Sequence, residues 1–107
     1  MNRVTPAELS ERLRLPEPPV LLDVREPEEH ALCSLPGSRL IPLADLPERL
    51  GEIADWKGRD LVVYCHHGVR SAHAIGFLQS AGFGRLTNLS GGIDRWSLEV
   101  DPSLPRY

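Results

Sequence analysis

Short apolar segments, each long enough for one buried strand, alternate with helical segments along this chain. Leu61–Tyr64 is apolar throughout, and Val20–Val24 is apolar except for Asp23 near its end. Continuous apolar runs of this length are typical of strands covered on both faces, as in parallel sheets. Parallel strands need crossover connections, which are usually helices. The pattern predicts an α/β fold with a parallel sheet, in a single domain spanning residues 1–107.

The other elements follow from local signals. Thr5, Pro6 and Glu8 form the N-cap, first-turn proline and capping box of a helix that continues to Leu13. Gly82 is suited to ending a later helix. The remaining expected elements are a helix at 26–32, a turn at 35–38, a strand at 39–42, a helical stretch at 43–56 divided by Pro47 and Gly51, a helix from Ser71 to Ala81, a strand at 86–89, a short helix after Gly91–Gly92 and an extended tail at 101–107.

The charges are unevenly distributed. The net charge of −3 argues against a general nucleic-acid-binding protein. The chain has 15 Asp and Glu residues, but none lies between residues 61 and 93. Cys65 lies in this acid-free window, together with Arg70 and three histidines. The absence of carboxylates suits a segment that must hold an anion.

Cys65 stands where an α/β protein places its ligands, directly after the carboxyl end of the strand Leu61–Tyr64. The helix that follows aims unpaired N–H groups and its positive end at the loop, which favours a thiolate. Gly68 permits backbone angles that let successive N–H groups converge on an anion. Arg70 adds a permanent charge and a fork of donors. The expected anion-binding loop comprises His66, His67, Gly68, Val69, Arg70 and Ser71.

The segment Cys65–Ser71 resembles the active-site loop of rhodanese-like sulfurtransferases, Cys-x-x-Gly-x-Arg-Ser/Thr. Leu21–Glu26 is similar to that family's Asp-x-Arg strand end, and Leu35–Ser38 to its Ile-Pro-Gly-Ala turn. Asn88–Trp96 is similar to its carboxyl-terminal Gly-Gly-x-x-x-Trp signature. The resemblance covers about residues 3–100. Cys33-Ser34 replaces the Gly-His that often precedes the family's turn, which changes the packing of the turn but not the chemistry of Cys65.

The resemblance implies a rhodanese-like fold, with about five mostly parallel strands flanked by helices on both faces. It also implies a sulfurtransferase in which Cys65 takes sulfane sulfur from a donor such as thiosulfate and passes it on from a persulfide. Arg70 would hold the donor oxyanion, and the loop amides would stabilise the sulfur anions. Asp23 and Arg25 would support the loop. The acceptor would be cyanide, a thiol or a protein.

Two other functions are compatible with this fold. A rhodanese-fold phosphatase or arsenate reductase also uses a cysteine and an arginine, but with five residues between them, whereas four lie between Cys65 and Arg70. The other is a rhodanese-fold protein without turnover, acting as a binding or sulfur-relay module. A catalytically inactive binding module would not require Cys65, Gly68 and Arg70. Because fold alone does not separate these functions, the choice rests on the loop, which favours sulfur transfer.

The remaining features concern cofactors, partners and compartment. The adjacent His66 and His67 fit zinc-ligand spacing poorly, and neither a metal nor an organic cofactor is expected. Val100–Tyr107 is similar to the end of rhodanese domains fused to adenylating enzymes, which suggests a sulfur-carrier protein as acceptor. Cys33 is interpreted as an inert buried thiol, with a resolving role toward Cys65 as the alternative. Two cysteines, no secretory signal and no membrane-length apolar run favour the cytoplasm.

Overall fold

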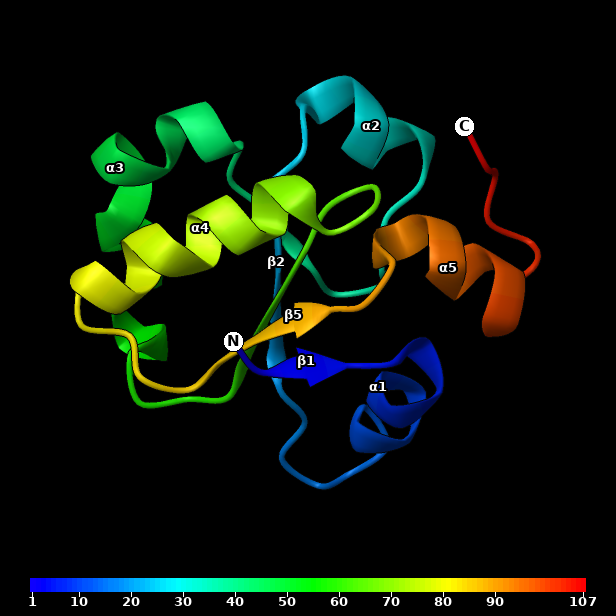
Figure 1. Ribbon diagram of the computed structural model, residues 1–107, viewed down its shortest axis with the longest axis horizontal. Coiled ribbons are helices and arrows are strands. Elements are labelled where there is room, and N and C mark those ends of the chain that lie inside the picture. The colour runs from blue at the N-terminus through cyan, green and yellow to red at the C-terminus, as the bar shows by residue number, and fades with distance from the viewer.

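All 107 residues are described by the computed structural model, which is built on a five-stranded sheet (Figure 1). Every neighbouring pair of strands is parallel, and the strand order is β1-β5-β4-β2-β3. The expected "mostly parallel" sheet is therefore entirely parallel, with β4 at its centre. The strands are β1 (Arg3–Val4), β2 (Val20–Asp23), β3 (Arg39–Leu40), β4 (Leu61–Tyr64) and β5 (Leu86–Leu89).

Helices connect the strands and cover the sheet. The capping box that begins α1 is present, since Thr5 N–H donates to Glu8 Oε1 at 2.9 Å and Glu8 N–H donates to Thr5 Oγ1 at 3.1 Å. The helices are α1 (Pro6–Arg12), α2 (Pro27–Leu32), α3 (Leu46–Arg49), α4 (Val69–Ser80) and α5 (Gly92–Glu99), with 3-10 helices η1 (Leu43–Asp45) and η2 (Leu50–Trp56) on either side of α3.

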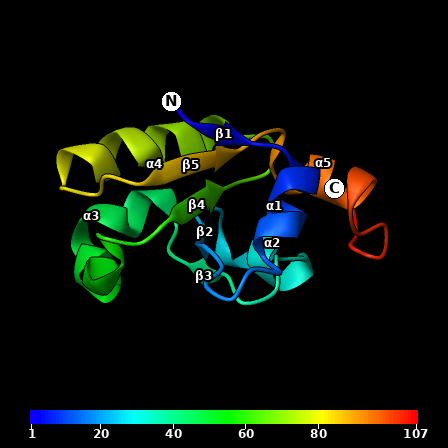
Figure 2. The ribbon, with the colours of Figure 1, turned by 90° about the horizontal axis from the view of Figure 1, so that it is seen from below.

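The sheet separates two hydrophobic cores. Figure 2 shows the helices that cover them, with α3 and α4 on the left and α1 and α5 on the right. Side chains of β4 alternate between the two cores, because successive residues of a strand point to opposite faces. Val63 and Cys65 pack with α3 and α4, whereas Val62 and Tyr64 pack with α1 and α5. All four side chains are at most 1% exposed. Cys65 therefore lies on the α4 side, at the end of the central strand.

Four local expectations need correction. The strand β1 was missed, because two residues are too short to show a periodicity; it pairs with β5, and Arg3 lies opposite Asn88. The helix α4 begins at Val69 rather than Ser71, because Gly68 serves as its N-cap with φ +110°. The tail is not simply extended, since Tyr107 returns to contact α2. The strand expected at 39–42 is also shorter, at 39–40.

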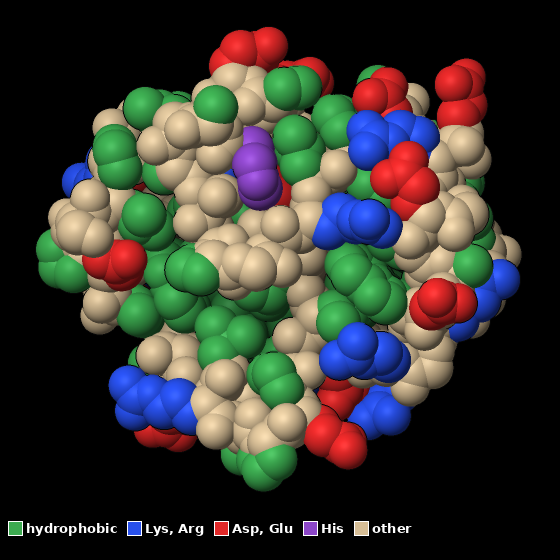
Figure 3. All heavy atoms as spheres, turned by 180° about the vertical axis from the view of Figure 1, so that it is seen from behind, with side chains coloured by type: hydrophobic (Ala, Val, Ile, Leu, Met, Phe, Trp, Pro, Cys, Tyr) green, Lys and Arg blue, Asp and Glu red, His purple; other side chains and the backbone are tan.

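The side on which β3 lies is the face seen in Figure 3, where hydrophobic side chains gather in the centre and charged ones surround them. Leu13, Pro18, Pro36, Trp56 and Trp96 are among the residues that line one groove of the molecule. None of the helices has both the length and the apolar content that crossing a bilayer requires.

Candidate active site

Cys65 is a buried thiol surrounded by hydrogen-bond donors. Gly68 N–H donates to its Sγ at 3.0 Å and Ser71 N–H donates at 3.4 Å. The side chain is only 1% exposed. The first-turn N–H groups of Val69 and Arg70 have no acceptor in the protein. The loop thus brings two amides onto the sulfur and leaves two more free at the same helix end, an arrangement that stabilises negative charge.

The shape of the loop depends on two glycines. Gly68 has φ +110°, which turns the chain from the loop into α4. Gly92 has φ +63°, and a Cβ at this position would lie 2.2 Å from His66 O. This close approach lets α5 hold the loop from behind: Ile93 N–H donates to Cys65 O at 2.9 Å and Asp94 N–H donates to His66 O at 3.2 Å. With their carbonyls held by α5, the loop residues direct N–H groups at the sulfur.

Asn88, the first residue of the segment Asn88–Trp96, is a further site residue that the sequence did not single out. Ser71 Oγ lies 3.5 Å from Cys65 Sγ and donates to Asn88 Oδ1 at 2.6 Å. Asn88 Nδ2 in turn donates to Gly68 O at 3.1 Å. The amide of one buried residue on β5 therefore fixes both the hydroxyl beside the sulfur and the carbonyl of the glycine that caps α4.

Arg70 forms a bidentate ion pair with the carboxylate of Glu29. Its Nη1 donates to Glu29 Oε1 at 2.7 Å and its Nη2 to Oε2 at 2.9 Å. The acid-free window in the sequence is thus not acid-free in space, because Glu29 from α2 and Asp94 from α5 both reach the loop. Arg70 was expected to hold the donor oxyanion; in this structure its guanidinium is bound to Glu29 instead.

The carboxylate of Glu29 accepts more hydrogen bonds than a surface carboxylate usually does. Besides Arg70, Glu26 N–H donates to Oε1 at 3.0 Å and the hydroxyl of Tyr107 donates to Oε2 at 2.7 Å. The hydrogen bonds from Arg70, more than any other cause, lower the pKa of Glu29 to about 2. A depressed carboxyl pKa stabilises the folded state above the ordinary pKa, and this stability is lost as the pH falls toward 2. The pair with Arg70 therefore persists throughout the neutral range.

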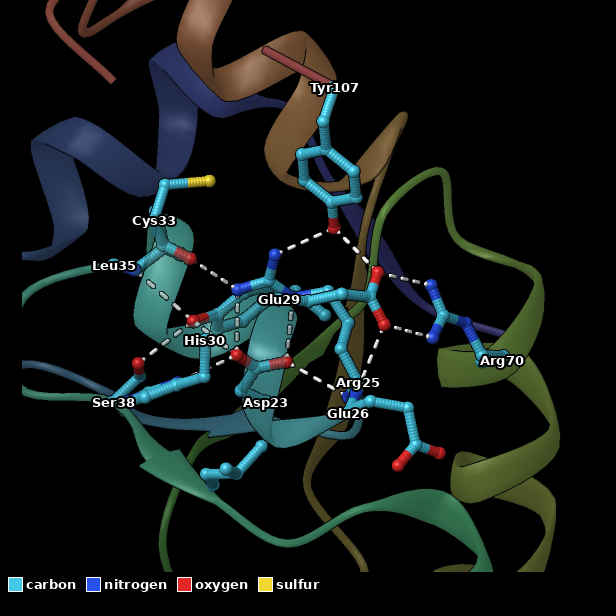
Figure 4. A network of polar contacts seen from close by, with 12 residues as sticks. Asp23, Arg25, Glu26, Glu29, His30, Cys33, Leu35, Ser38, Arg70 and Tyr107 are labelled. Atoms are coloured by element: carbon cyan, nitrogen blue, oxygen red, sulfur yellow. Dashed lines mark hydrogen bonds and ion pairs between the residues drawn. The ribbon is translucent and has the colours of Figure 1, made fainter. Parts of the chain in front are cut away.

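Tyr107 links this ion pair to the interior. Figure 4 shows its hydroxyl between Arg25 and Glu29, where it accepts from Arg25 Nη1 at 2.7 Å and donates to Glu29. Burial and the hydrogen bond to Glu29 raise the pKa of Tyr107 to about 12, so the hydroxyl remains protonated. Its ring stacks on His66 with centroids 4.0 Å apart. The tail therefore contacts the loop and supports its partner carboxylate.

Asp23 and Arg25 form a buried pair, and both side chains are fully inaccessible. Arg25 Nε and Nη2 donate to the two oxygens of Asp23 at 2.9 and 2.8 Å, and Nη2 also donates to Cys33 O at 2.6 Å. Tyr64 O–H donates to Asp23 Oδ2 at 3.2 Å. The pair has no hydrogen bond to Cys65; it contacts Tyr64, the residue before Cys65, and Tyr107, whose ring stacks on His66. Its geometry is that of structural support at the end of β2.

His66, His67 and Asp94 form the one cluster with metal-ligand atoms close together, all within 4.8 Å. Asp94 is engaged, because Arg106 Nε and Nη2 donate to its two oxygens at 2.9 and 3.3 Å. His66 Nε2 is buried without a hydrogen-bond partner. Burial, followed by the neighbouring His67, lowers the pKa of His66 below its ordinary value, so this ring is neutral at pH 7. Both histidines lie in the loop, and the ring of His66 is uncharged.

Cys33 and Cys65 are both free thiols. Cys33 packs in the α1–α5 core and Cys65 in the α3–α4 core, on opposite faces of the sheet. Figure 4 shows the Cys33 thiol turned away from the Asp23–Arg25 network. A disulfide between the two would need a rearrangement of the sheet edge, so the geometry favours the inert interpretation of Cys33.

The structure thus brings Gly68 and Ser71 into contact with the Cys65 sulfur, pairs Arg70 with Glu29 and keeps Asp23 and Arg25 out of contact with the sulfur. Sequence reasoning missed the site roles of Glu29, Asn88 and Tyr107. Only Glu29 had a local signal, as an acid in the first turn of a helix that starts at the sheet edge. The other two contacts join residues far apart in the chain.

A parallel sheet whose central strand ends in a cysteine, held by the first amides of the next helix, defines a class of thiol-based α/β domains. Within that class the chain belongs to the rhodanese-like domain family, whose sequence profile matches residues 5–99. The predicted fold and family are confirmed.

The chain is also similar to individual proteins, among them sulfurtransferases. A sulfurtransferase of Allochromatium vinosum is 39% identical over 97 residues, covering 91% of this chain and 89% of the relative. The probable adenylyltransferase/sulfurtransferase MoeZ of Mycobacterium tuberculosis is 36% identical over 108 residues, 99% of this chain but only 27% of that protein. The solved rhodanese-like domain protein of Staphylococcus aureus is 31% identical, with a TM-score of 0.85 over 100% of this chain and 99% of that one.

Proposed function

We propose that this protein is a sulfurtransferase that carries sulfane sulfur on Cys65. The observation that supports this most directly is the pair of N–H groups aimed at a buried sulfur, at 3.0 and 3.4 Å. A structural cysteine in a core has no need of amide donors, whereas a thiolate and a persulfide anion do. The similarity to sulfurtransferases points to the same chemistry.

In the first step the Cys65 thiolate attacks the outer sulfur of thiosulfate. A Cys65–sulfur bond forms, the bond between the two donor sulfurs breaks, and sulfite leaves with the bonding electron pair. The products are Cys65–S–S⁻ and sulfite, so the charge balances. Gly68 N–H and Ser71 N–H stabilise the initial thiolate, and the free N–H groups of Val69 and Arg70 are available to the outer sulfur of the persulfide.

In the second step a nucleophilic acceptor removes the outer sulfur. Cyanide or a thiolate attacks it, the sulfur–sulfur bond breaks, and the electron pair returns to Cys65 as thiolate. Because Cys65 is 1% exposed, the acceptor must meet the sulfur that projects from it rather than Cys65 itself. Relatives that combine adenylyltransferase and sulfurtransferase names support a protein acceptor of the sulfur-carrier type.

The test is the intact mass of the protein after exposure to thiosulfate. We expect a gain of the mass of one sulfur atom, mapped to the peptide containing Cys65, and its loss on addition of cyanide with formation of thiocyanate. The matched control is Cys33→Ser, which should gain and lose the same mass. No added sulfur on the wild type, or sulfur only on the Cys33 peptide, would contradict the proposal.

Glu29→Gln is expected to strengthen the binding of anionic donors. The carboxylate competes with a donor oxyanion for Arg70, and glutamine keeps the size and one acceptor but removes the charge. Losing a partly exposed ion pair of this kind changes a binding free energy by about 1 kcal/mol, so the KM for thiosulfate should fall about three- to tenfold. Steady-state kinetics at fixed cyanide concentration measure this.

Glu28→Gln is the matched control for that experiment, since Glu28 stands on the same helix, is exposed and has no ion pair. Its KM for thiosulfate should stay within about twofold of the wild type, as for a surface change without a partner. An unchanged KM in Glu29→Gln as well would mean that Arg70 supports the loop and does not bind the donor.

A further inference from the structure

A groove of about 380 Å³ lies beside the Cys65 loop, between the start of α4 and the strand ends of β1 and β5. In Figures 1 and 2 the amino-terminal segment and α4 run alongside each other on this side of the sheet. Gly68 and Val69 belong both to the groove and to the loop that holds the sulfur. The groove therefore borders the loop whose amide contacts the Cys65 sulfur.

The groove is lined by cationic and titratable nitrogen groups and by no carboxylate. Arg3, His67 and His73 line it, and Arg3 and His73 have no ion-pair partner. His67 lies 3.6 Å from Asp94, which is already held by Arg106. Although the protein has a net charge of −3, this groove beside the Cys65 loop carries an unpaired arginine and no carboxylate. Its charge complements an anionic partner.

The side chain of Val69 adds an apolar contact at the same place. It is 68% exposed, the highest value among the large exposed hydrophobic residues, although it stands at the first position of α4. An exposed valine at a helix start next to a buried sulfur has no packing role in this chain. Together with Arg3 it makes a surface that is apolar at the sulfur and positive further out.

Building on the proposed function, we propose that this groove binds an extended acidic segment of the acceptor protein and delivers its end to the Cys65 persulfide. The segment must be extended because Cys65 is buried. A folded surface cannot come close enough to the sulfur that Cys65 carries. It must be acidic because the groove offers Arg3 and two histidines and no carboxylate. A small acceptor such as cyanide needs neither the length nor the charge of the groove.

The experiment uses the persulfide form of the full chain and three synthetic peptides of equal length, each ending in cysteine and rich in aspartate, serine or lysine. Each peptide thiolate takes the outer sulfur and returns a thiolate to Cys65. We expect a second-order rate for the aspartate peptide about tenfold above that of the serine peptide, with the lysine peptide slowest. Salt should reduce the difference, since exposed charges are screened.

Arg3→Glu should reverse the order of the aspartate and lysine peptides while leaving cyanide turnover unchanged. Arg59→Glu is the matched control: it makes the same charge change at an exposed arginine without an ion pair, lining other grooves, and should behave as wild type. Equal rates for the three peptides would overturn the proposed role of the groove. So would an equal change in the peptide rates in both variants. Absence of any persulfide or cyanide turnover would instead overturn the proposed function.

Discussion

We expect Cys65→Ser to abolish sulfur transfer. Turnover of thiosulfate and cyanide should fall about a thousandfold or more, as it does when an enzyme loses its nucleophile. A serine hydroxyl is not ionised at neutral pH, and its oxygen cannot carry the sulfane sulfur through this reaction. The variant should also gain no mass on exposure to thiosulfate. Steady-state turnover and intact mass, measured on the same preparation, test both parts.

The interpretation requires that Cys65→Ser remains folded, and the structure indicates that it does. Serine is close to cysteine in size, and its Oγ can accept from the same Gly68 and Ser71 amides that now contact Sγ. Its free energy of unfolding should therefore match that of the wild type to within about 1 kcal/mol. A folded variant that retains more than about a tenth of wild-type turnover would show that another group carries the sulfur.

Local sequence signals predicted the elements that depend on local structure. The Thr5–Glu8 capping box, the apolar strand Leu61–Tyr64 and the glycine before α4 are each determined by neighbouring residues. The position of Cys65 at the carboxyl end of the central strand follows from the same local pattern combined with the general topology of parallel sheets. These signals are sufficient to locate the candidate site.

The electrostatic surroundings of the loop could not be predicted in the same way. Arg70 and Glu29 are 41 positions apart, and Tyr107 and Glu29 are 78 apart, so nothing near Arg70 in the sequence indicates its partner. A segment without acidic residues therefore does not make a site without them. The pairing of Arg70 with Glu29 has a chemical consequence: a donor anion at Arg70 must displace Glu29 or bind beside it, and cannot meet an unpaired guanidinium.

Gly92→Ala is expected to have the largest effect on stability. The new Cβ would lie 2.2 Å from His66 O and 2.5 Å from Cys65 O, and both atoms are backbone. The residue also has φ +63°, a conformation that costs alanine additional energy. Steric overlap and backbone strain together should lower the free energy of unfolding by about 3–5 kcal/mol. Denaturant titration of the variant and the wild type measures the loss.

The matched control is Gly76→Ala in the interior of α4, where a Cβ would meet nothing within 4 Å and φ is not positive. That variant should gain about 0.5–1 kcal/mol, because alanine favours a helix over glycine. In Gly92→Ala, α5 can relieve the overlap only by moving away, which releases the carbonyls of Cys65 and His66 from Ile93 and Asp94. Persulfide formation by the remaining folded fraction should then fall. Wild-type stability and wild-type persulfide yield in Gly92→Ala would show that the loop keeps its shape without α5.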